Sequence, residues 1–318
     1  MPVLITGAAG FIGSHLAERL VDAGESVVGI DSFTTYYDPA VKRRNIERLM
    51  GSDSFRMVEG SLREVDLNDL VAGKDVVYHL AAQPGVRRSW GREFEVYLDE
   101  NLLAMQLLLE AVRDAGVERF VFASSSSVYG DAERLPTREL DTPRPVSPYG
   151  VTKLAGEHLC HLYFSRFDLP TVPLRYFTVF GPRQRPDMAF TRFIQAATTD
   201  GEIEVFGDGL QSRDFTYVDD AVAATIAAGE RGHPGTVYNI AGGAQATVLE
   251  VIEILGELLG HSVPVRHLPP VPGDARHTGG EIEKARGDLG YAPRTGLKEG
   301  LSKQIAALAP LPPGAGPG

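Results

Sequence analysis

Cysteine is almost absent from this sequence of 318 residues, in which Cys160 is the only one. A single thiol excludes an intrachain disulfide framework and suits a reducing compartment. Long apolar runs are missing too: no stretch approaches the roughly 20 apolar residues that span a bilayer, and no basic leader precedes the first apolar run. We therefore expect a cytoplasmic protein with no membrane association.

Positive charge is also in short supply. Asp and Glu number 42 against 31 for Lys and Arg, which gives a formal net charge of −11 and argues against general affinity for nucleic acid or membrane surfaces. The protein can still bind an acidic ligand, because this requires only that a few arginines lie close together at one site. His79, His158 and His161 lack partners at metal-ligand spacing, so we predict no metal site.

What the first half does contain is a regular alternation of short apolar runs with amphipathic stretches, which is typical of βαβ units. Strands are predicted at residues 3–6, 26–31, 55–59, 75–80, 119–124 and 171–175. Helices are predicted at residues 11–23, 39–50, 93–115 and 148–167. This order predicts an α/β fold, a Rossmann-type doubly wound parallel sheet, over residues 1–180.

The rhythm changes from about Gly181. Short strands at 202–206 and 236–240 alternate with helices at 218–228 and 247–259. We predict a smaller C-terminal α/β lobe that binds substrate over residues 181–308, with some later segments returning to the first domain. The Pro- and Gly-rich residues 309–318 are expected to form a disordered tail.

A glycine-rich turn follows the first predicted strand and reads Thr6-Gly7-Ala8-Ala9-Gly10-Phe11-Ile12-Gly13. Its glycines permit a tight turn and let a pyrophosphate approach the backbone at the start of a helix. Asp31 ends the second strand, where its carboxylate would accept hydrogen bonds from an adenosine ribose and repel a 2′-phosphate. These features predict a site for NAD rather than NADP, with a purely structural turn as the alternative.

Tyr149 and Lys153 lie four residues apart on one face of a predicted helix, so both can point at one site. Tyrosine has a pKa of about 10, which a nearby ammonium and a positive nicotinamide ring would lower. The phenolate could then take a proton from a hydroxyl while the carbon gives hydride to the nicotinamide. This spacing is common, so its interpretation depends on the other motifs.

Four serines, residues 124–127, follow the fifth predicted strand. In a doubly wound sheet, ligands bind at the carboxyl ends of the strands. Small hydroxyls there would hydrogen-bond a substrate oxygen without crowding it. Taken by itself, the segment could equally be a polar turn of solvated serines.

Together these motifs resemble the extended short-chain dehydrogenase/reductase family, in particular its nucleotide-sugar epimerases and dehydratases, over about residues 2–305. By that resemblance Tyr149 is the base, Lys153 orients it and binds the nicotinamide ribose, and Ser125 polarises the reacting oxygen. Ser126 and Ser127 would line the same side of the sugar. The resemblance also implies that NAD is contacted by Gly7, Gly10, Phe11, Ile12, Gly13, Asp31, Ser32, Leu62, Leu80, Ala81, Ala82, Gln83, Asn101, Tyr149, Lys153 and Tyr176.

Three positions distinguish this chain from other members of the family. Ser61 stands where members often carry an Asp that contacts adenine. Dehydratases and decarboxylases usually place carboxylic acids after the serine strand, whereas Ser126 and Ser127 stand there and cannot act as such acids. The resemblance therefore favours C4 epimerisation, which needs only the removal of a hydride from C4 and its return.

Thr178 and the segment Arg185-Pro186-Asp187-Met188-Ala189 resemble UDP-glucuronic acid 4-epimerases, whereas UDP-galactose 4-epimerases typically have Asn at the position of Thr178. This implies conversion of UDP-glucuronic acid to UDP-galacturonic acid through a 4-keto intermediate, with tightly bound NAD regenerated each turnover. A 4-keto uronic acid loses carbon dioxide readily, so Arg185 is expected to clamp the carboxylate with help from Thr178. Alternatively, Arg185 is a loop residue paired with Asp187.

The UDP-sugar is the expected partner, together with a second copy of the chain. The resemblance implies a homodimer through a four-helix interface formed by the helices at 93–115 and 148–167. Sugar-nucleotide contacts are expected from Pro84, Gly85, Arg87, Thr178, Arg185, Phe206, Arg213 and Arg276, of which the last two would bind pyrophosphate. The alternatives are a UDP-glucose or UDP-N-acetylglucosamine 4-epimerase, a UDP-glucuronate decarboxylase, a nucleotide-sugar dehydratase, or a non-catalytic cofactor sensor.

Overall fold

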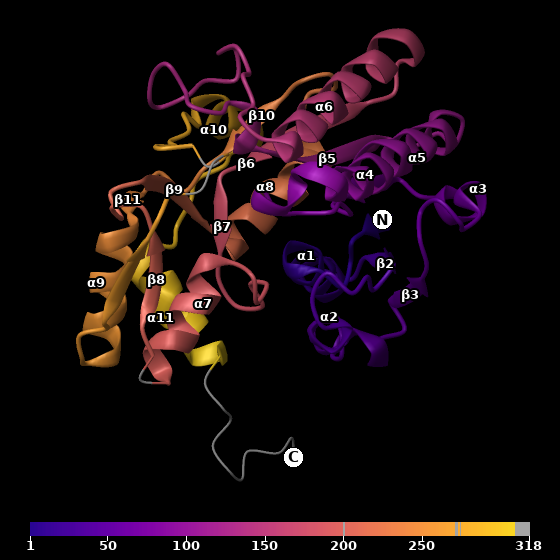
Figure 1. Cartoon of the computed structure of the whole chain (residues 1–318). Helices are drawn as coiled ribbons and strands as arrows, with labels where there is room; N and C mark the ends of the chain where they lie inside the picture. Colours follow the sequence, from indigo (N-terminus) through magenta and orange to yellow (C-terminus); the bar gives the residue numbers. More distant parts are fainter. Residues whose placement is uncertain (200, 271–272, 274, 309–318) are drawn as a thin grey trace.

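Seven parallel strands form the centre of the molecule, in a computed structural model that describes residues 1–199, 201–270, 273 and 275–308 (Figure 1). The strand order is β10-β6-β5-β4-β1-β2-β3. The strands are β1 (Pro2–Thr6), β2 (Ser26–Asp31), β3 (Phe55–Glu59), β4 (Val76–His79), β5 (Arg119–Ser125), β6 (Thr171–Tyr176) and β10 (Tyr238–Ile240). The order reverses at β1 and β4, so their carboxyl ends form the switch point where such sheets bind ligands.

Helices cover both faces of this sheet, which explains why its strands are apolar almost throughout. Val3 and Ile5 of β1 pack into one core, and Leu4 between them packs into a second core on the other face. The first core is covered by α1 (Phe11–Asp22), α8 (Val218–Arg231) and α10 (Glu283–Leu289), and α2 (Pro39–Asn45) packs against α1. The second is covered by α3 (Leu67–Val71), α5 (Ala104–Arg113) and α6 (Pro148–Phe167).

The smaller lobe lies at the left of Figure 1, in orange and yellow. Its three-stranded sheet has the order β11-β9-β7, and β12 pairs in parallel with β8. These strands are β7 (Thr178–Phe180), β8 (Ile203–Phe206), β9 (Ser212–Tyr217), β11 (Gln245–Thr247) and β12 (Val265–Leu268). They pack with α7 (Ala189–Thr198), α9 (Val248–Leu259) and α11 (Leu297–Leu308).

Two predicted helices are not continuous. The helix predicted at 39–50 ends at Asn45 and gives way to a 3-10 turn, Leu49–Gly51, so that Leu49 can pack into the core and the Asn45 amide can donate to the Ala9 carbonyl. The helix predicted at 93–115 consists of α4 (Phe94–Tyr97), a π-helical segment (Leu98–Leu103) and α5. A π-helical turn inserts an extra residue and rotates the side chains that follow it.

The other predicted elements form with small shifts at their ends. β4 loses one residue at each end, β5 and β6 each gain one, and the strand predicted at 236–240 begins at Tyr238. β10 and α8 come from the second half of the chain but pack with the seven-stranded sheet. The domain boundary at residue 180 stays a prediction, and the expected tail at 309–318 lies outside the described residues.

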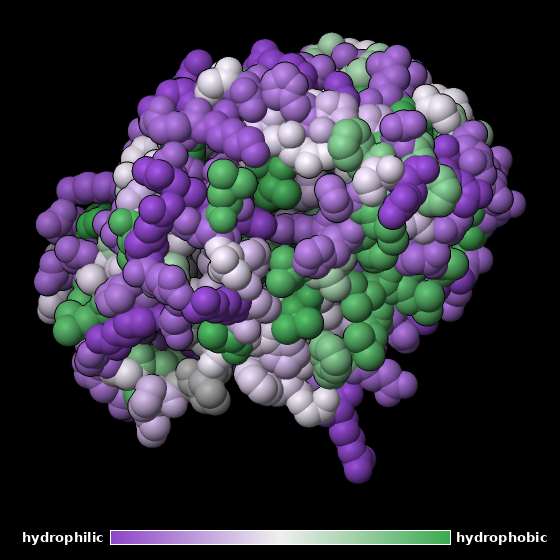
Figure 2. All heavy atoms as spheres, turned by 90° about the horizontal axis from the view of Figure 1, so that it is seen from above, coloured by the Kyte–Doolittle hydropathy of each residue, from purple (hydrophilic) through white to green (hydrophobic). Residues whose placement is uncertain are grey.

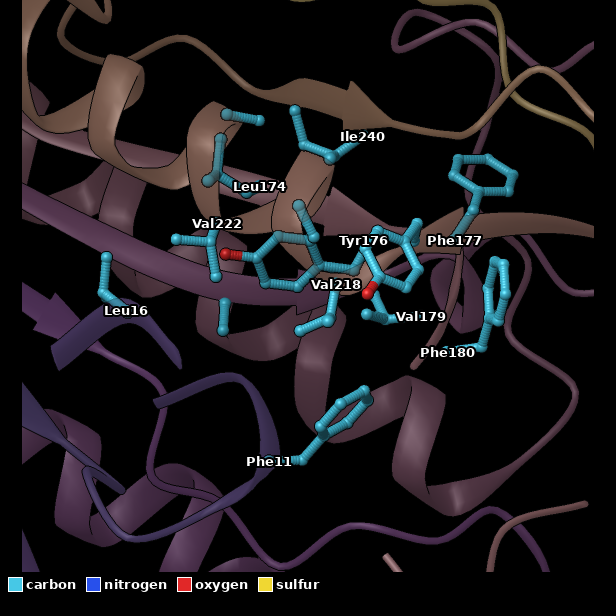
Figure 3. Packing of buried hydrophobic residues seen from close by; sticks show 14 of the residues in the cluster. Phe11, Leu16, Leu174, Tyr176, Phe177, Val179, Phe180, Val218, Val222 and Ile240 are labelled. Atoms are coloured by element: carbon cyan, nitrogen blue, oxygen red, sulfur yellow. The ribbon is translucent and has the colours of Figure 1, made fainter. Parts of the chain in front are cut away.

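A shared apolar core joins the two lobes beneath the switch point (Figure 3). Leu174 and Tyr176 come from β6, Phe180 from β7 and Val222 from α8, and all of them are buried. The Tyr176 hydroxyl bonds to Thr225 Oγ1 at 2.6 Å, which satisfies this buried polar group. Continuous packing of this kind positions the smaller lobe against the carboxyl ends of the strands.

Candidate active site

A cavity of about 930 Å³ lies between the carboxyl ends of the sheet strands and the smaller lobe. Its walls include all but two of the residues predicted for cofactor, catalysis and substrate, so segments distant in the sequence do meet at one site. The predicted residues that line it are Gly7, Gly10, Phe11, Ile12, Gly13, Asp31, Ser32, Leu80, Ala81, Ala82, Gln83, Pro84, Gly85, Arg87, Ser125, Ser126, Ser127, Tyr149, Lys153, Tyr176, Thr178, Arg185, Phe206, Arg213 and Arg276.

The glycine loop forms one end of this cavity. Gly7 has φ of 71°, and a Cβ there would lie 2.9 Å from the Ala81 nitrogen, so the turn requires glycine. A Cβ at Gly13 would collide with the Gly7 carbonyl oxygen. Helix α1 then begins at Phe11, after Gly10 as its N-cap, with no side-chain cap and no acidic residue in its first turn, which leaves its N–H groups available to a pyrophosphate.

Asp31 is buried at the end of β2, and two donors hold its carboxylate. The Phe33 backbone N–H donates to Oδ1 at 2.9 Å, and the Lys42 ammonium donates to the same oxygen at 2.8 Å. Among the described residues Oδ2 accepts no hydrogen bond, so it is free to take one from a ribose hydroxyl. The glycine loop and this carboxylate together fit the adenosine diphosphate half of NAD.

Tyr149 and Lys153 both lie on α6, which starts at the Ser147 N-cap with Pro148 in its first turn. Lys153 is buried, its Nζ donates to the Ala123 carbonyl at 2.8 Å, and it lies 5.9 Å from the centroid of the Tyr149 ring. Burial lowers the pKa of Lys153 to about 8. A lysine with that pKa stays mainly charged at neutral pH, and its ammonium faces the same cavity as the phenol.

The pKa of Tyr149 is shifted in the opposite direction to the shift predicted from the sequence. Burial raises the pKa of this phenol, and the charge of Arg185 and a hydrogen bond with Ser125 act to lower it. Lys153 is not among the groups that lower it, so the predicted lowering by the adjacent ammonium is wrong for the chain by itself. Further positive charge is needed beside Tyr149 to favour the phenolate, which a nicotinamide cation would supply.

The serine segment follows β5 and turns back on itself. Ser125 Oγ accepts from the Ser127 N–H at 3.1 Å and donates to Ser127 Oγ at 3.1 Å. Ser124 donates to Glu157, which forms a buried ion pair with Arg175. All four serines line the cavity, and Ser125 is the one that acts on the Tyr149 phenol, lowering its pKa through a hydrogen bond.

Asn101 and Leu62 are the two predicted cofactor residues that do not line the cavity. Leu62 packs into the core beneath α3 and α5. The π-helical segment turns Asn101 inward, where its Oδ1 accepts from the Gln83 N–H at 2.7 Å and its amide donates to Thr152 Oγ1 at 3.0 Å. Asn101 therefore ties the loop after β4 to the catalytic helix.

Arg185 approaches the catalytic centre from the loop between β7 and α7. Its guanidinium bonds Asp187 side-on, from Nε to Oδ1 and from Nη2 to Oδ2, both at 3.0 Å. The pairing with Asp187 that was the alternative role for Arg185 is thus present. It does not remove Arg185 from the site, because Arg185 lines the cavity and its charge acts on Tyr149.

The remaining predicted sugar-nucleotide residues line the cavity from the loop after β4 and from the smaller lobe. The Arg87 guanidinium lies 4.2 Å from the Phe206 ring centroid, so a cation covers one face of this predicted substrate-binding ring. Arg276 pairs with Asp208 at 2.6 Å. Arg213 Nη1 donates to the Ser212 carbonyl at 2.8 Å. The cations are present at the site, but protein groups hold each of them in this conformation.

Several cavity residues were not singled out from the sequence. Tyr36 and Tyr37, in the loop after β2, line the cavity together with Lys42 and Arg88. The only sequence signal was the Tyr36-Tyr37-Asp38-Pro39 segment, which resembles the same epimerase subgroup but did not indicate a role. No cluster of three or more potential metal ligands occurs in the described parts of the chain, and none of the helices described there has the length and apolarity to cross a membrane.

A family model described as the NAD dependent epimerase/dehydratase family matches residues 3–241. The chain belongs to this family. It is 45% identical over 313 residues to an uncharacterised UDP-glucose epimerase, YtcB, of Bacillus subtilis, covering 98% of this chain and 99% of that protein. A UDP-glucuronate 4-epimerase of Thermodesulfobacterium geofontis is 35% identical over 312 residues, covering 95% and 94%.

A solved structure of similar shape is the UDP-glucuronic acid 4-epimerase of Bacillus cereus in complex with UDP-glucuronic acid and NAD. It is 45% identical to this chain, with a TM-score of 0.94, over 96% of this chain and 98% of that one. Membership of the NAD dependent family agrees with the glycine loop and with the carboxylate at the end of β2.

Proposed function

We propose that this protein is an NAD-dependent UDP-glucuronate 4-epimerase that interconverts UDP-glucuronic acid and UDP-galacturonic acid. The observation that carries the proposal is the position of Arg185, a cation in the cavity whose charge reaches the catalytic Tyr149. A neutral sugar needs no cation beside its reacting carbon, whereas a uronic acid places a carboxylate there. The solved Bacillus cereus relative of that name supports the same assignment.

Each group of the chain has a role in this reaction. The Tyr149 phenolate takes the proton of the C4 hydroxyl and later returns it, and Ser125 donates a hydrogen bond to the same sugar oxygen. Lys153, held by the Ala123 carbonyl, keeps a positive charge beside the phenol. Bound NAD, held by the glycine loop and Asp31, supplies hydride acceptance and return. Gln83 and Asn101 keep the loop after β4 fixed to α6.

Retention of the carboxylate is the second requirement. Once C4 is a ketone, the sugar is a β-keto acid and can lose carbon dioxide. In that loss the C5–C6 bond breaks, its electron pair stays on the sugar as an enolate, and the enolate takes a proton at C5. Carbon dioxide leaves readily when the C5–C6 bond stands perpendicular to the plane of the ketone. An arginine that holds the carboxylate near that plane opposes this orientation. Ser126 and Ser127, which occupy the positions of the acids used in elimination, provide no competing acid.

A neutral UDP-hexose is the second candidate substrate. The Bacillus subtilis relative carries the name of a UDP-glucose epimerase, and a solved relative, MoeE5, 44% identical, is described in complex with UDP-glucose and NAD. The same relative is also described with UDP-glucuronic acid. The catalytic groups are compatible with either sugar, so the role of Arg185 separates the two candidates.

The Arg185→Ala variant tests this assignment. We expect its kcat/KM for UDP-glucuronic acid to fall about a hundredfold more than its kcat/KM for UDP-glucose, the size expected for loss of a charge-assisted bidentate contact. The same two substrates are measured with the wild-type protein under the same conditions. An unchanged preference between the two sugars would contradict the proposal, and equal losses on both would indicate a role in folding or in cofactor binding.

We also propose that the protein forms a homodimer through α4, the π-helical segment, α5 and α6. Large apolar side chains are exposed along these elements, which is unusual for a surface that meets only water. They are Val96, Leu98, Leu103, Val151, Leu162 and Phe167. Figure 2, which looks down on the molecule, shows hydrophobic residues gathered on the right-hand part of this face. A second copy would bury them.

A further inference from the structure

Asp187 lies at the sugar end of the cavity, and none of the roles assigned above belongs to it. Its carboxylate accepts two hydrogen bonds from Arg185, and both residues line the cavity. A two-point contact between a carboxylate and the planar guanidinium fixes both the plane and the direction of that group. The direction of Arg185 in this structure is therefore set by Asp187.

The contact leaves one defined edge of the guanidinium for another anion. In the described part of the chain, the hydrogen bonds of Arg185 leave from Nε and Nη2, and Nη1 donates none. A carboxylate that approaches end-on would meet Nη1 and the second hydrogen of Nη2. The Arg185 side chain is only 19% exposed, so that edge is reached from the cavity rather than from the outer surface.

Asp187 is itself held from the cofactor-binding side. The Tyr36 hydroxyl donates to Asp187 Oδ2 at 3.4 Å, and the Arg88 guanidinium lies 5.1 Å from the Tyr36 ring centroid. Tyr36 passes over Gly85, where φ is 104° and a Cβ would lie 2.5 Å from the tyrosine hydroxyl. The loops that follow β2 and β7 therefore meet at this carboxylate, and the loop after β4 packs against Tyr36.

We propose that Asp187 is a positioning residue for substrate specificity: by holding the Nε–Nη2 edge of Arg185, it directs the Nη1 edge at the carboxylate of a uronic acid sugar. The inference rests on the proposed function and extends it, because Asp187 acts through Arg185 and does not touch the sugar. An arginine freed from Asp187 can follow the carboxylate into the orientation perpendicular to the ketone, from which carbon dioxide leaves.

The test compares Asp187→Asn, Asp187→Ala and Asp187→Glu with the wild-type holoenzyme on UDP-glucuronic acid. For Asp187→Ala we expect KM to rise about tenfold, as for the loss of one charge-assisted hydrogen bond, and a UDP-pentose to appear beside the 4-epimer in proton NMR. Asp187→Asn keeps the shape and one acceptor oxygen, so it should show a smaller change. Asp187→Glu should restore part of the wild-type product ratio.

A matched control is available on α5. Arg113 bonds Asp114 with the same side-on geometry, Nε to Oδ1 at 3.1 Å and Nη2 to Oδ2 at 2.8 Å, at a place that does not line the cavity. Asp114→Asn should leave KM and the product ratio at their wild-type values. The role proposed for Asp187 is overturned if Asp187→Ala also keeps both values, or if its KM falls, which would mean that Asp187 competes with the substrate.

Calorimetric binding separates this inference from the proposed function. We expect the wild-type protein to bind UDP-glucuronic acid more tightly than UDP-glucose, and Asp187→Ala to reduce that preference about tenfold. The measurement needs no turnover. A protein that shows this preference but forms no 4-epimer would contradict the proposed function and still support the positioning role. An unchanged preference in Asp187→Ala would contradict the positioning role, whatever the product.

Discussion

Burial and charge act on the Tyr149 phenol in opposite directions. Burial raises its pKa, and the nearby phenol of Tyr36 adds to the rise, whereas the charge of Arg185 and the hydrogen bond with Ser125 lower it. A proton acceptor with a raised pKa works only if positive charge is placed beside it. We therefore expect Arg185 to assist proton transfer in addition to its proposed role in recognition of the sugar.

This double role of Arg185 predicts a change in pH dependence. The reaction needs the Tyr149 phenolate, so kcat/KM should rise with pH until that phenol is ionised. Removing the charge of Arg185 raises the pKa of Tyr149 and moves this rise to higher pH. At a pH below the rise, the rate should fall about tenfold for each pH unit by which the profile moves. Rates of the wild-type protein and of Arg185→Ala on UDP-glucose, measured over about pH 6 to 10 so as to include the usual pKa of tyrosine, check this expectation.

Arg185→Lys is the control for charge, because it keeps a cation but loses the planar fork. Its pH profile should stay near that of the wild-type protein, while its preference for the uronic acid should weaken. Identical profiles for all three proteins would mean that the cation does not act on the phenol.

At the scale of single residues, much of the candidate site was predictable from the sequence because it depends on local backbone geometry and spacing. Gly7 and Gly13 are required by a turn whose geometry is local, and Tyr149 and Lys153 share a helix face because of their spacing. The Arg185–Asp187 contact could be offered from the sequence only as an alternative. Tyr36 was not assigned a role at all, because it reaches Asp187 from a segment 151 residues away in the chain.

At the scale of elements, the catalytic helix α6 is fixed from several sides. Glu157, one turn after Lys153, pairs with Arg175 of β6, and both side chains are almost fully buried. A Cβ at Gly156 would lie 2.6 Å from the Phe122 ring, so α6 packs closely on β5. The predicted helix at 148–167 was correct in its bounds, and its Ser-Pro start is a local signal that the sequence shows directly.

The predicted helix at 93–115 was wrong in its continuity for the opposite reason. Its apolar pattern is helical throughout, and nothing in the pattern indicates the π-helical segment. The interruption is explained by tertiary contacts, since the inserted residue turns Asn101 toward Gln83 and Thr152. Similarly, the packing of Leu49 against the core ends α2 early.

The outer face of α4, the π-helical segment, α5 and α6 is the surface on which we expect a second copy of the chain to bind. Leu162→Glu places a charge on the proposed interface, and burial of an unpaired charge is costly. We expect analytical ultracentrifugation to show a dimer for the wild-type protein and a monomer for Leu162→Glu at about 10 μM, a concentration at which specific interfaces of standard size are usually formed.

Leu140→Glu is the matched control, since Leu140 is 95% exposed and lies outside the helices of the proposed interface. It should remain a dimer. A wild-type protein that sediments as a monomer, or a Leu162→Glu variant that stays dimeric, would contradict the assignment of this face.

At the scale of the whole molecule, the site exists only because two lobes meet. The glycine loop, Asp31 and α6 belong to the lobe of the large sheet, and the smaller lobe supplies Arg185, Arg213 and Arg276. The doubly wound sheet followed from the alternation of apolar and amphipathic segments. β10 and α8 are later segments that pack with this sheet, and the sequence alone could not name them because their place depends on packing between distant segments.

The proposed epimerisation can be followed directly by proton NMR of the purified protein with UDP-glucuronic acid and with no NAD added. We expect UDP-galacturonic acid, formed until the two epimers reach equilibrium, without any UDP-pentose, because the cofactor is tightly bound and regenerated and the carboxylate is retained. A UDP-pentose product would contradict the carboxylate clamp. No reaction with this substrate, repeated with NAD supplied, alongside turnover of UDP-glucose would contradict the assignment to a uronic acid.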